Sequence, residues 1–306
     1  MTGVDSPTKA HQGMPGEPAL STRAFYIVDV FAQARFCGNP LAVIVGDDLT
    51  DDAMAAITRE MNYSETTFVG QPDGQGRWPV RIFTPGREIP FAGHPTIGTA
   101  WLIKEHLRTS GDNTVILRLK VGDVPVVFGD DGVGWMTPPV PVLGQMEPAQ
   151  AAADLLGLPV DAIDTEFPVQ TVDVGIRFTL IPLRSLDAVR QASYQRHLGA
   201  VRAQKGQCPD VLLFTKESTI DAAHHIHARM FDADPRVPED PATGSANTCL
   251  AAWINAHNYL PGHCGEVLVE QGHFMQRPSL LRLRLTPTIT VGGRVVMAAQ
   301  GNLFGV

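Results

Sequence analysis

The sequence lacks the features that mark membrane, secreted and nucleic-acid-binding proteins. No apolar run approaches the roughly 20 residues that a membrane helix needs, so no membrane segment is expected. Only four cysteines are present, they form no CxxC pair, and they stand far apart at Cys37, Cys208, Cys249 and Cys264. This pattern predicts reduced thiols and a cytoplasmic location rather than a disulfide framework. Basic residues are also scarce, 24 Lys and Arg against 32 Asp and Glu, and none cluster, so we expect no nucleic-acid partner.

What the chain does contain is enough apolar sequence for a large core. Hydrophobic residues make up 44% of its 306 residues and charged residues 18%. At about 150 residues per domain, this length predicts two lobes. The first 22 residues are rich in Pro, Gly, Ser and Thr and lack the apolar segment of a signal peptide, which predicts a flexible tail. We therefore expect a tail at 1–22, an N-terminal lobe at 23–130 and a C-terminal lobe at 131–306.

Short strand patterns dominate both halves, and each half has one strongly apolar helix. The helices at 97–107 and 245–256 are apolar nearly all round, which predicts that both are deeply buried. Further helices are predicted at 51–61, 149–156 and 185–193. Strands are predicted at 25–31, 41–45, 65–69, 78–83, 114–121, 124–128, 133–136, around Thr171 and Phe178, and at 211–215, 224–231 and within 267–296.

An internal repeat is the strongest signal in the sequence. Arg81-Ile-Phe-Thr-Pro-Gly-Arg-Glu-Ile-Pro resembles Arg229-Met-Phe-Asp-Ala-Asp-Pro-Arg-Val-Pro, and soon afterwards His94-Pro-Thr-Ile-Gly-Thr-Ala aligns with Asp240-Pro-Ala-Thr-Gly-Ser-Ala. The repeat predicts an α+β fold of two pseudo-symmetric lobes, each an antiparallel β-barrel-like sheet wrapped around a central helix. His94 and Asp240 are expected at equivalent helix starts that face one cleft. Free N–H groups and positive dipole ends would bind a carboxylate there.

Several motifs together resemble the PhzF-like (phenazine biosynthesis) isomerase family. They are Ser64-Glu-Thr-Thr-Phe-Val, Phe91-Ala-Gly-His-Pro-Thr-Ile-Gly-Thr-Ala and Asp240-Pro-Ala-Thr-Gly-Ser-Ala, supported by Phe36-Cys-Gly-Asn-Pro-Leu-Ala-Val-Ile, Gln271-Gly and Arg277-Pro-Ser. The resemblance covers roughly residues 24–306. It implies a diaminopimelate-epimerase-like fold, a homodimer, and proton transfer that uses neither a metal nor an organic cofactor.

The resemblance also implies roles for individual residues. Glu65 is similar to the family's general acid/base, and His94 and Asp240 to its catalytic partners. The residues implied to contact the substrate are Gly93, Gly244, Ser245 and Asn39. Ordinary structural roles stay open for these positions, since Glu65 could be an exposed strand-edge residue and Asp240 a helix cap.

A cluster of histidines invites a metal-site interpretation. In His224-His-Ile-His227, a strand would place His225 and His227 on one face and His224 on the other. No cysteine or carboxylate group completes a site at a convincing spacing, so we expect no metal.

The function that these observations favour is an isomerase acting on a small carboxylated metabolite. Glu65 would take a proton from one carbon and return it to another, shifting a double bond or tautomer. Two alternatives stay open. One is an amino-acid-type epimerase or racemase, with Asp240 or His94 as a second base. The other is a non-catalytic small-molecule-binding protein on the same fold. Related racemases use two cysteines, and the first repeat contains none, which argues against two-thiol chemistry.

Overall fold

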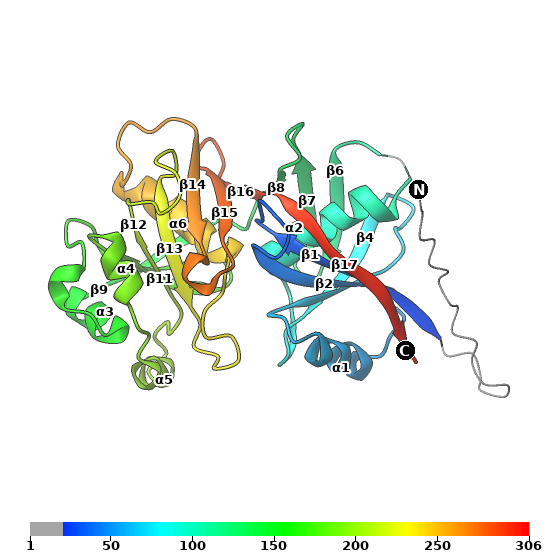
Figure 1. The fold of residues 1–306 in the computed structure, drawn as a ribbon, viewed down its shortest axis with the longest axis horizontal. Coiled ribbons are helices and arrows are strands. Elements are labelled where there is room, and N and C mark those ends of the chain that lie inside the picture. Colours follow the sequence, from blue (N-terminus) through cyan, green and yellow to red (C-terminus); the bar gives the residue numbers. More distant parts are fainter. Residues whose placement is uncertain (1–20, 110, 306) are drawn as a thin grey trace, which may run out of the picture.

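The computed structural model describes residues 21–109 and 111–305, and these form two lobes side by side (Figure 1). Of the predicted tail at 1–22, only the last two residues fall within this range, and Thr22 already begins strand β1. No helix among the described residues combines the length and the hydrophobicity needed to cross a membrane.

Helices and strands occur in both lobes, and most of the predicted elements are present. The helices are α1 (Asp51–Met61), α2 (Gly93–Leu102) with a π-helical turn (Ile103–Leu107), α3 (Ala149–Leu156), a 3-10 turn (Val160–Ala162), α4 (Leu186–Gln191), α5 (Arg196–Gln204), α6 (Gly244–His257) and a second 3-10 turn (His273–Met275). The strands are β1 (Thr22–Val30), β2 (Asn39–Val45), β3 (Thr66–Val69), β4 (Arg77–Phe83), β5 (Glu88–Ile89), β6 (Thr114–Leu119), β7 (Gly122–Phe128), β8 (Gly134–Met136), β9 (Val142–Glu147), β10 (Val169–Asp173), β11 (Arg177–Pro182), β12 (Val211–Thr215), β13 (Ile226–Phe231), β14 (Glu266–Gln271), β15 (Ser279–Arg284), β16 (Thr290–Gly293) and β17 (Val295–Phe304). Of these, β5, β9 and α5 were not predicted, and β17 continues beyond the predicted segment that ends at residue 296.

Each lobe encloses one apolar helix, as the sequence predicts. In the first lobe α2 packs against β1, β2, β3, β6, β7, β8 and β17, and in the second α6 packs against β9, β10, β11, β15 and β16. Gly98 lets α2 approach β1 and β2, because a Cβ there would lie 2.7 Å from Val30 and 2.8 Å from Leu41 side-chain atoms. Close packing at Gly98 therefore fixes the position of α2 against β1 and β2.

The strand pairings repeat the same order in both lobes. Most pairs are antiparallel, but β2–β3 and β4–β6 are parallel in the first lobe, and β11–β12 and β13–β14 are parallel in the second. One ion pair is also repeated. Arg81 holds Glu88 through two hydrogen bonds of 2.9 Å, and Arg229 holds Glu239 through two of 2.8 Å. These matches support a duplicated unit.

The register of the repeat differs from the one expected from sequence. Arg81 and Glu88 are seven residues apart and Arg229 and Glu239 are ten apart, so the second copy has a turn three residues longer. Across the two copies, Asp240 therefore matches Ile89, since each directly follows the ion-paired glutamate. The predicted equivalence of His94 and Asp240 is wrong, because α6 begins at Gly244 and not at Asp240.

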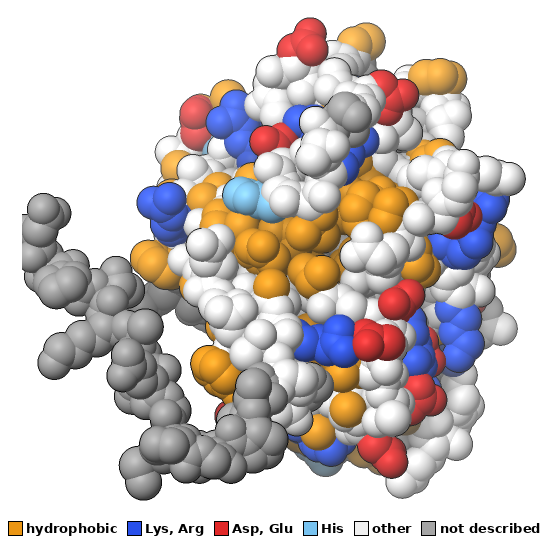
Figure 2. Space-filling view, turned by 90° about the vertical axis from the view of Figure 1, so that its right-hand side faces the viewer, with side chains coloured by type: hydrophobic (Ala, Val, Ile, Leu, Met, Phe, Trp, Pro, Cys, Tyr) orange, Lys and Arg blue, Asp and Glu red, His pale blue; other side chains and the backbone are white. Residues whose placement is uncertain are grey.

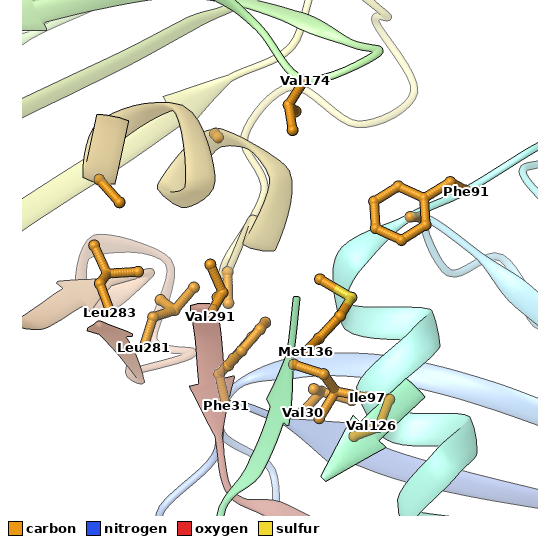
Figure 3. Close-up of a cluster of buried hydrophobic side chains, with 14 of the residues drawn as sticks. Val30, Phe31, Phe91, Ile97, Val126, Met136, Val174, Leu281, Leu283 and Val291 are labelled. Carbon is orange, nitrogen blue, oxygen red and sulfur yellow. The ribbon is translucent and has the colours of Figure 1, made fainter. Parts of the chain in front are cut away.

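The two lobes share one continuous apolar core. Figure 3 shows Phe31 beside Leu281 and Val291 and shows Met136 beside Ile97, all within one cluster of buried side chains. Strand β8 pairs with β7 on one side and with β16 on the other, which joins the sheets. The last strand, β17, returns to pair with β1 (red beside blue in Figure 1). The lobe boundaries at 23–130 and 131–306 remain predictions, and two strands that follow residue 130, β8 and β17, pack on α2 of the first lobe.

Candidate active site

A cavity of about 490 Å³ lies between the lobes and gathers the predicted site residues. Six of the seven line it directly: Glu65, Gly93, His94, Asp240, Gly244 and Ser245. The seventh, Asn39, is buried behind them and contacts both His94 and Asp240. The structure thus brings together residues from positions 39 to 245 of the chain. Their catalytic and binding roles remain to be tested.

Glu65 lies immediately before β3, at the edge of the cavity. Its side chain is 17% exposed, and its Oε2 atom has no hydrogen-bond partner among the described residues. Burial, and next the charge of Asp240, raises the pKa of Glu65 to about 8. Near neutral pH this carboxyl group holds a proton that it is able to donate. Its ionised form is a stronger base than an ordinary carboxylate.

His94 lies in the first turn of α2 and points its Nε2 atom toward Glu65. The distance from Nε2 to the Glu65 Oε2 atom is 3.5 Å, and Nε2 has no hydrogen-bond partner within the described chain. Burial lowers the pKa of His94 to about 3, so the ring is neutral. The Asn39 amide nitrogen lies 3.3 Å from Nδ1, but its two hydrogens have closer acceptors in the Asp240 carboxyl group and the Ala242 carbonyl, both at 2.9 Å. His94 therefore lies between Asn39 and Glu65 as a neutral ring.

Asp240 belongs to the second lobe and lies in the turn that precedes α6. One carboxyl oxygen accepts from the Asn39 amide at 2.9 Å and the other from the Thr243 hydroxyl at 2.5 Å. Burial raises the pKa of Asp240 to about 7, although these two hydrogen bonds oppose the rise. Because the amide of Asn39 also contacts His94, one side chain links the polar groups of both lobes.

The starts of α2 and α6 meet at the floor of the cavity. A Cβ on Gly93 would lie 3.0 Å from the Gly244 Cα and 3.2 Å from the Ser245 backbone nitrogen. Only glycines allow this approach without a backbone shift. The first N–H groups of each helix have no intrahelical acceptor, and both dipoles are positive at this end. The prediction of two helix starts at one cleft is confirmed, and the structural match of His94 is Ser245.

Gln271 and Arg277, which belong to the motifs that resemble the family, hold the site in place. Gln271 donates to the backbone carbonyl of Asp240 at 2.8 Å and to the Thr243 hydroxyl at 3.1 Å. Arg277 donates to the carbonyls of Cys37 and Gly38, each at 2.9 Å. Arg277 therefore fixes the loop that leads into Asn39 from the other lobe. The motifs signalled these positions, but their roles depend on contacts across the fold.

The histidine cluster is arranged differently from the sequence prediction. His224 and His227 do not face opposite sides, because β13 begins only at Ile226 and both rings contact Glu270, at 2.7 and 3.0 Å. Glu270, His227 and His273 offer three possible ligand atoms within 4.8 Å of one another. Glu270 also accepts from the backbone of Thr219 and of Ile220. Glu270 therefore holds the loop that precedes β13 in place. The expectation of no metal stays a prediction.

Two similar lobes with buried carboxyl and imidazole groups between them suit a small-molecule isomerase, and the comparisons with known proteins show that class. The chain belongs to the phenazine biosynthesis-like (PhzC-PhzF) family, whose profile matches residues 28–301. An uncharacterized isomerase of Mesorhizobium japonicum is 34% identical, over 93% of this chain and all of the relative.

Two further comparisons agree with this family. The trans-2,3-dihydro-3-hydroxyanthranilate isomerase of Pseudomonas aeruginosa is 32% identical, over 92% of this chain and 99% of the relative. The fold is that of a PhzF-family phenazine biosynthesis protein from Bacillus anthracis, with a TM-score of 0.82 at 22% identity, over 92% of this chain and 99% of that one.

Proposed function

We propose that this isomerase shifts a proton between two carbons of a small carboxylated metabolite, with Glu65 as the acid/base and with no cofactor. The observation that carries the proposal is the carboxyl group of Glu65, which lines the cavity, has an unpartnered Oε2 atom beside His94 and has a pKa raised to about 8. Such a group moves protons at neutral pH in either direction.

The surrounding residues suit this reaction. In the tautomer that carries its proton on Nε2, the neutral ring of His94 donates to a substrate oxygen or to the Glu65 carboxylate once that group is ionised. Asp240 raises the pKa of Glu65 and thereby strengthens it as a base. The N–H groups at the starts of α2 and α6 bind the substrate carboxylate. The Pseudomonas relative is named for the isomerisation of a dihydro-hydroxyanthranilate, which is a small carboxylate of this kind. Its name guides the choice of probes.

The test is proton NMR in D2O with a panel of small carboxylates that includes dihydro-hydroxyanthranilates and cyclic amino acids. We expect deuterium incorporation or a moved double bond with the native chain and a loss of at least about a hundredfold in Glu65→Gln. Glu60→Gln, on the exposed side of α1, is the matched control and should retain the native rate. Undiminished exchange in Glu65→Gln would overturn the role of Glu65.

The same experiment separates the remaining alternatives. Inversion at the carbon that gains deuterium would support an epimerase or racemase. Both oxygens of Asp240 are already hydrogen-bonded, which makes it less suited to be the second base. Binding of a panel member without any exchange would support a binding protein.

We further propose that the protein works as a cytoplasmic homodimer. Figure 2 shows apolar side chains gathered on the end of the molecule that the first lobe forms, beside a histidine. In this lobe the half-buried Tyr26 and Trp101 both pack on the His106 ring. All four cysteines are free, as expected in a reducing compartment. Light scattering should give twice the chain mass of 33.0 kDa, and the chain mass alone would refute the dimer.

A further inference from the structure

A hydrogen-bond relay runs from Gln271 through Thr243 to the carboxyl group of Asp240. Gln271 is fully buried at the end of β14, and its Nε2 atom donates to the Asp240 backbone carbonyl at 2.8 Å and to the Thr243 hydroxyl at 3.1 Å. Its Oε1 atom accepts from the Asn247 amide at 2.9 Å and from the Thr243 backbone N–H at 3.3 Å. Turning this amide over would set an oxygen against a carbonyl and a nitrogen against two donors, so its orientation is fixed.

The relay also fixes the direction in which the Thr243 hydroxyl donates. Because the Gln271 Nε2 atom only donates, the Thr243 oxygen accepts from it and gives its own hydrogen to Asp240 Oδ2 at 2.5 Å. The other carboxyl oxygen of Asp240 accepts from Asn39 at 2.9 Å. A proton on Oδ2 would displace the hydroxyl hydrogen, which has no other acceptor within the described chain. The arrangement therefore suits an ionised Asp240.

The charge of Asp240 depends on these neutral donors. Burial raises the pKa of Asp240 to about 7, and the hydrogen bond from Thr243 opposes this rise more strongly than the one from Asn39 does. Burial of Glu65, and next the charge of Asp240, raises the pKa of Glu65 to about 8. The two carboxyl groups therefore ionise in order as the pH rises, Asp240 before Glu65.

The charged surroundings of the two carboxyl groups do not favour this order. The charge of Asp232 raises the pKa of both Asp240 and Glu65. The charge of Glu239, which is paired with Arg229 at 2.8 Å, raises the pKa of Asp240 as well. On the other side, His94 lies beside Glu65 as a neutral ring. The remaining charged residues that line the cavity are Arg87, Asp210, Asp234 and Arg236.

We propose that Thr243 and Gln271 are positioning residues that keep Asp240 ionised and thereby hold the transferable proton on Glu65. This inference rests on the proposed function, because it explains why Glu65 rather than Asp240 is the acid/base. Without the Thr243 hydroxyl, Asp240 would lose a donor to its charged form and would keep its proton to higher pH. Glu65 would then have a neutral neighbour and would ionise at lower pH.

Carbon-13 NMR titration of the carboxyl carbons measures both pKa values in the full chain without substrate. Asp240→Asn and Glu65→Gln assign the two signals. In Thr243→Val, which keeps the shape of the side chain, the pKa of Asp240 should rise by about 1 or more and that of Glu65 should fall by at least about 0.5. Gln271→Met, which frees the hydroxyl to turn away, is an independent second variant and should move both values in the same directions.

Two further variants control for a general disturbance of the site. Thr243→Ser keeps the hydroxyl and should keep both native pKa values. Thr248→Val removes a buried hydroxyl of α6 that donates to the Gly244 carbonyl at 2.9 Å, and it should also keep them. An unchanged pKa of Asp240 in both Thr243→Val and Gln271→Met would overturn the relay. An equal shift in Thr248→Val would overturn it too, because the effect would then be packing.

Deuterium exchange in D2O tests the proposed function separately. The limb of the pH profile that depends on Glu65 should move to lower pH in Thr243→Val. Exchange that depends on Glu65, with the profile and both pKa values unmoved in Thr243→Val, would leave the function standing and reject the relay. Shifted pKa values without exchange of any panel member would support the relay and reject the function.

Discussion

Replacing Glu65 with Gln should stabilise the folded protein, and increasingly so as the pH rises. The pKa of Glu65 is about 8 in the folded protein against a model value of 4.5. The folded state therefore retains a proton that the unfolded state releases between these two values. By linkage, the free energy of unfolding falls as the pH rises through this window and levels off above about pH 8. Gln is neutral in both states, so the variant escapes this loss.

The size of the effect follows from the same two values. A change in pKa from 4.5 to about 8 corresponds, at about 1.4 kcal/mol per unit, to at most roughly 5 kcal/mol. Water reaches the side chain, which is 17% exposed, and screens part of this cost. We expect the free energy of unfolding of Glu65→Gln to exceed that of the native chain by about 2 kcal/mol at pH 9 and by less than about 0.5 kcal/mol at pH 5.

Urea unfolding followed by tryptophan fluorescence at pH 5 and pH 9 measures both values. Glu60→Gln serves as the control, since its side chain is exposed on α1. A stability gain in Glu65→Gln that is equal at both pH values would mean that the effect is packing rather than charge. A loss of stability at pH 9 would refute the argument that burial of this carboxyl group is costly.

Three further substitutions test the contacts that support the site, each by urea unfolding at neutral pH. Arg277→Ala should cost about 3 kcal/mol, because it leaves the carboxyl group of Asp29, 2% exposed, without its cationic partner; a neutral result would remove Arg277 as the anchor between lobes. Glu270→Gln should cost roughly 2 kcal/mol, since His227 and the adjoining loop lose a charged acceptor; unchanged stability would show that this buried network is not needed for the fold. Gly38→Ala should cost roughly 2 kcal/mol or more, because the residue has φ +69° and a Cβ would lie 2.3 Å from a backbone oxygen; a tolerated alanine would mean that the loop rearranges freely.

Much of the fold could be predicted because its signals are local. The sequences of the buried helices α2 and α6 are apolar nearly all round. The short strands lie between turn residues, and their apolar and polar residues alternate. The elements that were missed lack such signals. Strand β9 is exposed at nearly every residue, and α5 has a weakly amphipathic sequence that begins without a capping side chain. Their formation depends on pairing with β10 and packing against α3, which no local pattern encodes.

The site was predictable in its members but not in its geometry. Family motifs pointed to Glu65, His94 and Asp240, and the structure gathers all three. The alignment of the repeat was wrong because the turn after β13 is three residues longer than the turn after β4, and the sequence alignment left no gap there. Asp210, which also lines the cavity, gave no signal at all. It precedes β12 as Glu65 precedes β3, and this match depends on the register of strands that pair across distant parts of the chain.

That register changes how the duplication relates to the chemistry. A duplicated unit that conserved its polar residues would offer a symmetric site with two equal bases, as a racemase requires. Here the matched positions carry unlike residues, one copy holding the polar group that the other lacks or replaces: Asn39 and Ile176, Ile89 and Asp240, His94 and Ser245. The acid/base candidate Glu65 has a matched carboxyl group in Asp210, but Asp210 has no imidazole beside it at the next matched position. If Glu65 is the acid/base, an unsymmetrical site with an imidazole beside only one of the two matched carboxyl groups fits the proposed proton shift better than inversion.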